Sequence, residues 1–388
     1  MARKIFDEAD LAAVRRVFES GNLSYLGGQA GAELEARVSA RLGCRHTIAI
    51  HSAMAGLQMG LMAIGVGEGD EVICDPIVPF GAKSALYLHA RPVFADVDPL
   101  THNVDPASIR ERLTTRTKAI VVTHLWGLPA PMDEIMAIAR ERKLGVVEDC
   151  AHALFATFGG KQAGTFGTAG VFSFQQSKHL TTGDGGLLVT DDPYVAEQAN
   201  NMLRFGVIPP RLSWNFRMNE LTAAVAGVQW ERAAGYVEED RRAARLYTDA
   251  LAGHPALYHP AGDERTQHSY HIWTATYRGD ETVGLPQAEF QERCKEAGLQ
   301  AGFGYIKVPP YLHPMFSLTN GFGYDVWRDA GHCPYRRGYC PAAEYLMPRL
   351  VMITISTQPY EFHQRNAEAL HRVLRDLPSS PTPGGRGG

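Results

Sequence analysis

Several features that mark specialised classes of protein are missing from this chain of 388 residues. No stretch approaches the ~20 consecutive apolar residues that a membrane-spanning helix needs, and the charged start MARKIFDEADLAAVRRVFESG lacks the apolar run of a secretory signal. No block of Lys and Arg stands out, and the formal net charge is −4, which does not favour nucleic-acid binding. We therefore expect a cytoplasmic protein with neither a membrane nor a nucleic-acid partner.

The sequence also lacks the cysteine and histidine patterns that are typical of metal sites and of disulfide-bonded proteins. The six cysteines include no CxxC pair, and the one close pair, Cys333 and Cys340, has no His arranged beside it as a metal ligand. This pattern predicts reduced thiols and no metal site. Cys150 follows the carboxylate of Asp149, which would raise its pKa and make it a poor nucleophile.

What is present is the composition of an ordinary globular protein, with 45% hydrophobic and 21% charged residues. Short apolar runs alternate with helix-like stretches, and the runs lie at 46–52, 71–76, 92–97, 118–127, 144–150, 170–175 and 186–192. Runs of this kind are typical of strands buried on both faces. The alternation predicts an α/β fold in which a mainly parallel seven-stranded sheet lies between helices. In such sheets ligands bind at the carboxyl ends of the strands.

The chain is long enough for two domains. A helix is predicted over 217–251, with Leu221, Val225 and Val228 on its buried face. We expect it to lead from a large domain, residues 1–235, into a smaller α+β C-terminal domain, residues 236–376. The remaining residues, 377–388, are rich in Pro, Gly and Ser and are expected to be disordered.

Two polar residues follow predicted strands. Asp149 closes the run LGVVEDC, and Lys178 lies between an apolar strand and the glycine-rich turn at 183–186. Taken singly, such an Asp is most often a helix cap or a turn former, and such a Lys is normally solvated. Taken together, they also fit a functional site. Asp149 would be a carboxylate that faces a heteroaromatic nitrogen, and Lys178 would be a partly desolvated amine that can form a Schiff base.

Three ordered segments, VEDCAHA, GTFGTAGVFSFQQSKHLTTGDGG and WNFRMNELTAA, resemble the DegT/DnrJ/StrS family of sugar aminotransferases. The similarity also covers SAMAGLQMGLMAIGVGEGDEVICDP, RPVFADVDPLTHNVDP and TKAIVVTHLWGLPAPMDEI, so it spans about residues 20–235. The resemblance implies a fold-type-I aminotransferase that depends on pyridoxal 5′-phosphate or its amine form. It also implies a homodimer with shared active sites.

The resemblance implies catalytic roles for two positions of this sequence and cofactor-binding roles for two more. Lys178 matches the Schiff-base lysine, and Asp149 matches the carboxylate that pairs with the pyridine nitrogen of the cofactor. His152 matches the residue near the phenolic oxygen of the cofactor, and Phe80 matches the aromatic that stacks on its ring. A carboxylate beside the pyridine nitrogen keeps the cofactor an electron sink.

Five further positions match the parts of the family that hold the cofactor, and four of them lie where the family binds its phosphate. Ser52, Ala53 and Met54 open a helix after a strand, and Ser173 matches the phosphate-binding hydroxyl. Asn215 matches an asparagine that the family contributes from the partner subunit. Met54 stands where the family usually has Thr, so one side-chain donor to the phosphate is lost.

The activity implied is transfer of an amino group from glutamate or glutamine to a keto-sugar or keto-cyclitol, in aminoglycoside or aminosugar antibiotic biosynthesis. The segment QQSK, in place of the family's common Y-P-T-K, is more like members that act on cyclitol ketones. The alternatives are a nucleotide-linked keto-sugar aminotransferase, a dehydrating enzyme similar to 3-amino-5-hydroxybenzoate synthase, and a non-catalytic regulator that binds the cofactor. A nicotinamide oxidoreductase is disfavoured because no glycine fingerprint follows the first strand.

The residues that would contact the substrate are less clearly marked. Four ring-bearing residues are candidates for the pocket, namely His124, Trp126, Tyr305 and His313. Packing between the two domains would account for them equally well.

Overall fold

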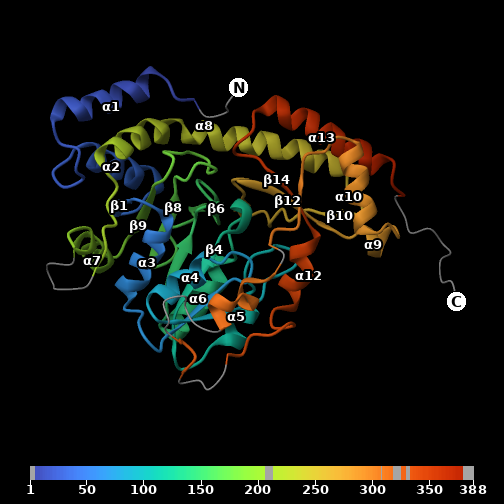
Figure 1. Cartoon of the computed structure of the whole chain (residues 1–388), viewed down its shortest axis with the longest axis horizontal. Helices are drawn as coiled ribbons and strands as arrows, with labels where there is room; N and C mark the ends of the chain where they lie inside the picture. Colours follow the sequence, from blue (N-terminus) through green and yellow to red (C-terminus); the bar gives the residue numbers. More distant parts are fainter. Residues whose placement is uncertain (1–4, 206–212, 307, 318–324, 329–332, 379–388) are drawn as a thin grey trace.

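The computed structural model describes residues 5–205, 213–306, 308–317, 325–328 and 333–378 (Figure 1). Its largest sheet has seven strands in the order β1-β9-β8-β5-β4-β2-β3. Their bounds are β1 His46–Ile50, β2 Glu71–Cys74, β3 Arg91–Phe94, β4 Thr117–Thr123, β5 Gly145–Asp149, β8 Ala169–Ser173 and β9 Gly186–Thr190. Only β9 runs antiparallel to its neighbours β1 and β8, and the other pairs are parallel. The predicted mainly parallel seven-stranded sheet is therefore confirmed.

Helices cover both faces of this sheet. Those of the first half of the chain are α1 Glu8–Ser20, α2 Ala30–Leu42, α3 Ala53–Ile64, α4 Phe80–Tyr87, α5 Pro106–Arg112, the short 3-10 helix η1 Leu125–Gly127, α6 Met132–Arg142 and α7 Pro193–Leu203. Alternate residues of β4 show the two layers. Val121 packs in one core cluster with α3 and α4, whereas Ile120 and Val122 pack in another with α5 and α6. Strands buried on both faces explain the continuous apolar runs.

A single long helix, α8 (Glu220–Leu251), connects this part of the chain to the rest. Its first half packs with α2 against the large sheet, and its second half packs in a separate core cluster with α13 (Tyr360–Arg375). Figure 1 shows α8 crossing the whole width of the molecule, with α1 at one end and α13 beside the other. The division after residue 235 falls inside this helix and stays a prediction.

The buried face predicted for this helix is wrong in detail. Leu221, Val225 and Val228 are only half-buried, whereas Ala226 and Trp230 are buried in the cluster formed with α2. The other residues of that face are mostly alanines, because α8 lies close to neighbouring helices and small side chains permit the close approach. A search for large apolar residues therefore points to the wrong side of the helix.

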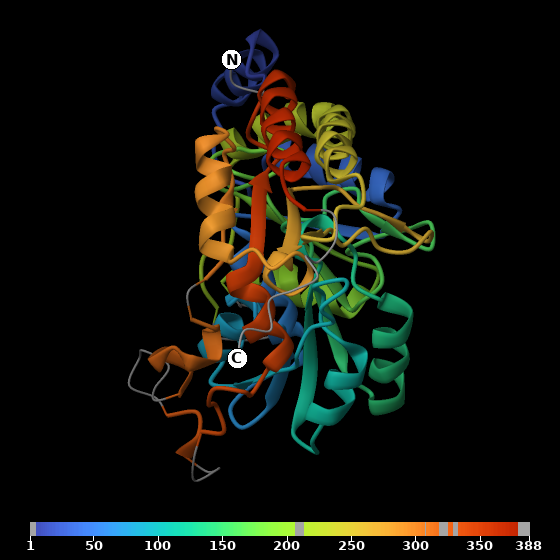
Figure 2. The same ribbon diagram turned by 90° about the vertical axis from the view of Figure 1, so that its right-hand side faces the viewer.

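The C-terminal part contains a four-stranded antiparallel sheet in the order β10-β12-β14-β13. Its strands are β10 Leu257–Tyr258, β12 Ile272–Tyr277, β13 Gly302–Phe303 and β14 Leu350–Thr354, and its further helices are α9 Gly279–Thr282, α10 Gln287–Glu296, η2 Pro310–Leu312, α11 Pro314–Ser317 and α12 Pro341–Arg349. A third, small sheet is formed by β6 Thr157–Phe158, β7 Lys161–Gln162 and β11 Thr266–Gln267. Figure 2 shows α10 and α13 beside the strands of the four-stranded sheet.

Two further expectations concern membrane-spanning helices and the C-terminal end of the chain. Among the described residues, every helix is too short or too polar to cross a membrane. The tail predicted over 377–388 lies outside the described residues from Ser379 on. Its first residue, Leu377, is buried in the core cluster of the C-terminal part.

Candidate active site

A cavity of about 470 Å³ lies where several strands of the large sheet end. Eight of the nine predicted site residues line it, namely Ser52, Ala53, Met54, Phe80, Asp149, His152, Ser173 and Lys178. Asp149 and Ser173 are the last residues of the parallel strands β5 and β8, so the carboxyl ends of these strands bring them to one edge. Residues from distant parts of the chain thus converge on one place.

A buried carboxylate and a partly buried amine share this cavity. Asp149 is 2% exposed, and its Oδ1 accepts a hydrogen bond from the backbone N–H of Ala151 at 3.0 Å. Burial lowers the pKa of Lys178 to about 8, while the charge of Asp149 acts in the opposite direction. Burial also raises the pKa of Asp149, against that hydrogen bond and the charge of Lys178. A substantial fraction of the Lys178 amine is therefore neutral near pH 8, as nucleophilic attack requires.

The N-terminus of α3 forms a second wall. Ser52 is the N-cap of this helix, and its side chain accepts a hydrogen bond from the Ala55 N–H at 3.2 Å. The backbone of Gly186, at the start of β9, lies so close that a Cβ there would come within 3.0 Å of the Ala53 nitrogen. N–H groups in the first turn of a helix have no partner within the helix and attract anions. This wall therefore suits a phosphate group.

Phe80 begins α4 and is 39% exposed on the cavity side. Asp75 supports the loop before it, because Oδ1 accepts hydrogen bonds from the Ile77 and Val78 N–H groups at 2.9 and 2.7 Å. Its Oδ2 accepts one from the Thr123 hydroxyl at 2.7 Å. Burial raises the pKa of Asp75 to about 6. The sequence reasoning missed this residue, since an Asp before Pro is an ordinary turn signal.

His152 is held by ring contacts. Its ring is stacked 4.7 Å from that of His271 and 6.0 Å from that of Trp126, between centroids. Trp126 has a positive φ of 63°, a strained conformation that is often found near functional sites. Burial, reinforced by Lys178 and His179, lowers the pKa of His152 well below its usual value, so the ring is neutral. Its buried Nδ1 has no hydrogen-bond partner among the described residues, which fits a ligand that supplies one.

Asn215, the ninth predicted residue, does not line this cavity. It lies in a neighbouring cavity of about 590 Å³, and Ser52 and Met54 line both. The surface around Asn215 is aromatic, with Trp214 48% and Tyr87 41% exposed. The contribution of Asn215 to a partner subunit's site stays a prediction.

Of the four candidates for substrate contact, only Tyr305 lines the cavity. Burial, together with the charges of Asp75 and Asp149, raises its pKa to about 12. Trp126 is fully buried behind His152 and contacts Tyr305 edge to face at 5.0 Å. His313, which directly follows η2, lines neither cavity.

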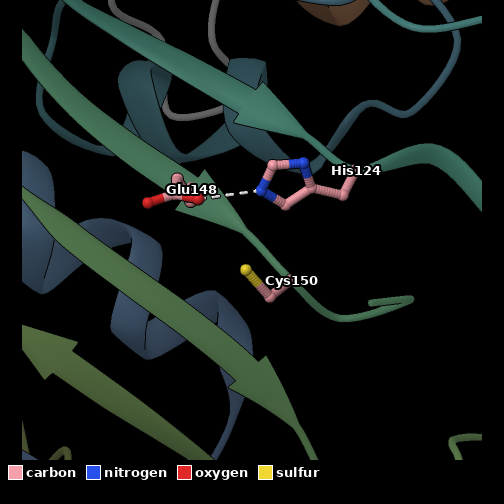
Figure 3. A group of neighbouring side chains, drawn as sticks. All are labelled: His124, Glu148 and Cys150. Carbon is pink, nitrogen blue, oxygen red and sulfur yellow. Dashed lines mark hydrogen bonds and ion pairs between the residues drawn. The ribbon is translucent and has the colours of Figure 1, made fainter. Parts of the chain in front are cut away.

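His124 is a supporting residue rather than a pocket residue (Figure 3). Its Nδ1 accepts a hydrogen bond from the Ala130 N–H at 3.0 Å, so the neutral ring carries its proton on Nε2. Nε2 therefore donates to Glu148 Oε2 at 2.9 Å. Glu148 also accepts hydrogen bonds from the backbone N–H groups of Gly164, Phe166 and Gly167. This fully buried carboxylate holds the end of β5, where Asp149 follows.

Cys150 completes the group drawn in Figure 3. Ligand atoms of His124, Glu148 and Cys150 lie within 4.8 Å of one another, which is close enough for a metal site. A metal would need the lone pair of His124 Nε2, which is protonated in this network. Burial raises the pKa of the Cys150 thiol well above its usual value, and the two neighbouring carboxylates add to the effect. The group is therefore structural, and Cys150 is a poor nucleophile, as expected.

Several cavity residues were not found from the sequence. They are Leu57, Ala151, Gln175, Ser177, Asp184, Gly185, His271 and Ile272. Gln175 and Ser177 lie within the QQSK segment, so proximity to Lys178 was an available signal. His271 and Ile272 lie more than 90 residues further on, and nothing local marks them. Only the folding of the C-terminal sheet against the large one places them here.

Comparison with known proteins agrees with this geometry. The model of the DegT/DnrJ/EryC1/StrS aminotransferase family matches residues 4–326. A UDP-N-acetyl-3-dehydro-α-D-glucosamine 3-aminotransferase of Acidithiobacillus ferrooxidans is 32% identical over 359 residues, which cover 90% of each chain. A putative L-glutamine:3-amino-2,3-dideoxy-scyllo-inosose aminotransferase of Streptoalloteichus tenebrarius is 33% identical over 322 residues, covering 79% of this chain and 77% of that protein.

Solved structures show the same architecture. The X-ray structure of an aminotransferase from Psychrobacter cryohalolentis superposes with a TM-score of 0.83 at 27% identity, covering 96% of this chain and 98% of the other. The fold-type-I architecture expected from the resemblance is thus confirmed. Accordingly, the chain belongs to the DegT/DnrJ/EryC1/StrS family and is an aminotransferase that depends on pyridoxal 5′-phosphate.

Proposed function

We propose that this enzyme transfers an amino group from glutamate or glutamine to a keto-cyclitol or unphosphorylated keto-sugar, in aminosugar or aminoglycoside antibiotic biosynthesis. One observation carries the proposal. A single cavity gathers a lysine of lowered pKa, a buried carboxylate and the N-terminus of α3. These are the groups that a transaminase needs to hold its cofactor and to move a proton.

Each wall of the cavity suits one part of pyridoxal phosphate. The α3 N-terminus and Ser173 would hold the phosphate, Asp149 would face the ring nitrogen, and Phe80 would lie against the ring. His152 Nδ1, which has no partner among the described residues, would meet the phenolic oxygen. When bound, the cofactor supplies an electron sink for the carbon that loses its proton.

Lys178 carries the proton transfer in this proposal. Its neutral amine would hold the cofactor until the amino donor takes its place. The freed amine would then act as a general acid–base for the proton that leaves the donor's Cα. Burial keeps the pKa of Lys178 near the working pH, which is where such a catalyst is most effective. Asp149 stays buried and opposite in charge to the electron-poor ring.

The scarcity of positive charge on the cavity wall supports an amino-group acceptor that carries no phosphate. Among the described residues that line the cavity, Lys178 is the only Lys or Arg, and two carboxylates, Asp149 and Asp184, also line it. A diphosphate group is normally met by several cations. The relative named for a scyllo-inosose substrate acts on a cyclitol, and a neutral polyol fits this wall.

A nucleotide-linked keto-sugar is the second candidate. It is supported by the relative named for a UDP-linked substrate, which is similar over 90% of each chain. A nucleotide would need cations from outside the described cavity wall, for example from a second subunit. Inhibition by UDP or another nucleoside diphosphate would favour this candidate.

Assembly, domain roles and location complete the proposal. We expect a cytoplasmic homodimer in which Asn215 reaches the partner's cavity. Residues 1–235 would hold the cofactor, and residues 236–376 would close the substrate side. His271, Ile272 and Tyr305 support this closure, because they line the cavity from the C-terminal part.

The test uses enzyme loaded with the amine form of the cofactor. Keto-cyclitols, keto-glycosides and nucleotide keto-sugars are added one at a time, and recovery of the visible absorbance of the aldehyde form reports acceptance. Mass spectrometry of the product separates amination from dehydration. Recovery with a keto-cyclitol is the expected result. Recovery with nucleotide keto-sugars alone would contradict the acceptor class, and no recovery with any ketone would support a regulator.

A further inference from the structure

A hydrogen-bonded chain ties the C-terminal sheet to the segment that carries Lys178. His271 lies directly before β12, is 3% exposed and lines the cavity. Its Nδ1 is 2.7 Å from the hydroxyl of Ser356. That hydroxyl donates to the backbone carbonyl of Ser177 at 2.9 Å, and Ser177 immediately precedes Lys178.

These contacts show which atom donates the proton in each of the two hydrogen bonds. A carbonyl oxygen only accepts hydrogen bonds, so the single proton of the Ser356 hydroxyl is committed to Ser177. Nδ1 of His271 must then donate to Ser356. The main chain strengthens the connection, because the Ile355 N–H donates to the His271 carbonyl at 3.1 Å.

The same ring reaches the other side of the cavity. His271 stacks on His152 with a centroid separation of 4.7 Å and an interplanar angle of 30°. It also lies 5.6 Å from the ring of His179, which follows Lys178. One side chain therefore contacts both His152 and the turn that bears Lys178.

We propose that His271 is a positioning residue for the amine of Lys178, through Ser356 and Ser177, and for the ring of His152, through direct stacking. The inference rests on the proposed function, in which these two groups hold the cofactor. Catalytic groups must stay within about 0.5 Å of their productive geometry. The lysine turn is exposed at Gln175 and Gln176, so a brace from Ser356 to Ser177 limits its movement. Nothing in the sequence near Lys178 supplies this brace.

The experiment compares three variants of the full-length holoenzyme. Ser356→Ala removes the link to Ser177 but keeps the imidazole. His271→Asn keeps an N–H donor near the position of Nδ1 but removes the stacking ring. His102→Asn is the control, because His102 is also fully buried and hydrogen-bonded to a hydroxyl, that of Thr276 at 2.9 Å, yet lines neither cavity at this site. Asn tolerates the positive φ of 66° at position 102.

Three readouts are combined. We expect Ser356→Ala and His271→Asn to lower kcat about tenfold or more, with KM for the amino donor changed less than about threefold, because misplaced groups slow the chemical step more than binding. The absorbance and circular dichroism of the bound cofactor should change in both variants and stay unchanged in His102→Asn. In the 15N spectrum of histidine-labelled wild type, His271 should be protonated on Nδ1.

Two results would overturn the inference. One is a wild-type His271 whose only ring proton is on Nε2. The other is a pair of variants whose kcat and cofactor spectra match those of wild type and of His102→Asn. Failure of the proposed function looks different, because wild type itself would then transfer no amino group, while the 15N spectrum would still report the hydrogen-bonded chain.

Discussion

At the scale of single residues, the chemistry depends on a lysine and an aspartate that are ordinary apart from their surroundings. Asp149 is almost completely buried and Lys178 is partly buried. Burial raises the pKa of Asp149 and lowers the pKa of Lys178, so it favours the neutral form of each. Their opposite charges resist this change. The balance leaves Lys178 with a pKa of about 8, which makes its amine reactive under mild conditions.

Lys178→Ala is expected to abolish both cofactor attachment and amino transfer. The reason is that no other Lys lines the described part of the cavity. Wild-type protein incubated with pyridoxal phosphate should show visible absorbance that dialysis does not remove, and the variant should show none. Lys161→Ala is a suitable control, because Lys161 is exposed on β7. Retention of the absorbance by Lys178→Ala would exclude this lysine as the attachment point.

At the scale of secondary structure, the N-terminus of α3, which lines the cavity, lies against the backbone of β9. A Cβ on Gly186 would lie 2.5 Å from the Phe172 carbonyl oxygen and 3.0 Å from the Ala53 nitrogen. Only glycine permits this approach, because real Cβ contacts are longer. The side chain of Ser52 then caps the helix whose first N–H groups face the cavity.

Gly186→Ala should therefore weaken cofactor binding. Relief of the clash must move β9 away from β8 and from the start of α3. Overpacking of this kind costs about 1–3 kcal/mol, and the same energy lost from binding is a roughly 5- to 150-fold loss of affinity. Titration with pyridoxal phosphate measures the affinity, and a thermal unfolding midpoint separates it from global instability. Gly235→Ala, in the middle of α8 with no atom within 4 Å of the new Cβ, should leave affinity unchanged. Equal affinity in the two variants would contradict the role of the close approach.

At the scale of the whole molecule, the C-terminal part completes the cavity, and an exposed aromatic surface lies beside it. His271, Ile272 and Tyr305 come from beyond α8. Asn215 lies in the adjoining cavity, next to the exposed ring of Trp214. Exposed aromatic groups of this kind are typical of protein interfaces.

A mixture of inactive variants tests whether subunits share sites. Asn215→Ala and Lys178→Ala should each be inactive or nearly so. If Asn215 serves the partner's cavity, a dimer of one chain of each kind contains one complete site. After random exchange of subunits, about a quarter of wild-type activity should return, since half the dimers are mixed and each has one of two sites intact. No recovery after proven exchange would place Asn215 outside the partner's site.

The contact between the two sheets should be sensitive to acid. His102 is buried against Thr276 of β12, and burial lowers its pKa to about 3. In the unfolded chain the pKa of His102 is near 6.5. Between about pH 6.5 and pH 3 the unfolded state therefore binds a proton that the folded state does not bind. The stability that depends on neutral His102 is complete above pH 6.5 and is lost as the pH falls toward 3.

Comparison of wild type with His102→Asn isolates this effect from other titrating groups. Between pH 7.5 and pH 5, the free energy of unfolding should fall by about 2 kcal/mol more in wild type than in the variant. Denaturant unfolding at the two pH values measures the difference. Equal losses would mean that His102 is protonated in the folded state at pH 5.

Much of the fold and of the candidate site could be predicted from local sequence patterns. The alternating apolar runs predict the seven-stranded sheet, because strands buried on both faces need continuous apolar residues. The position of Asp149 at the end of a strand was also predicted, and it is confirmed. Ser173 was named only through the family resemblance, and the structure places it at the end of the neighbouring parallel strand β8. Reasoning from local patterns misjudged the buried face of α8, where close packing against neighbouring helices favours alanine over Leu221 and Val228.

The sequence by itself determined the fold class, the family and eight residues of the cavity wall, because these depend on periodicity and on motifs within short segments. Only the tertiary structure decided that His124 braces Glu148, that Tyr305 lines the cavity and that His271 reaches Lys178 through Ser356. These relationships join residues from different elements, and His271 and Ser356 are 85 residues apart. His124 meets Glu148 because β4 and β5 are neighbours in the large sheet. The other two relationships arise when the C-terminal sheet packs against the large one, and no local pattern records that contact.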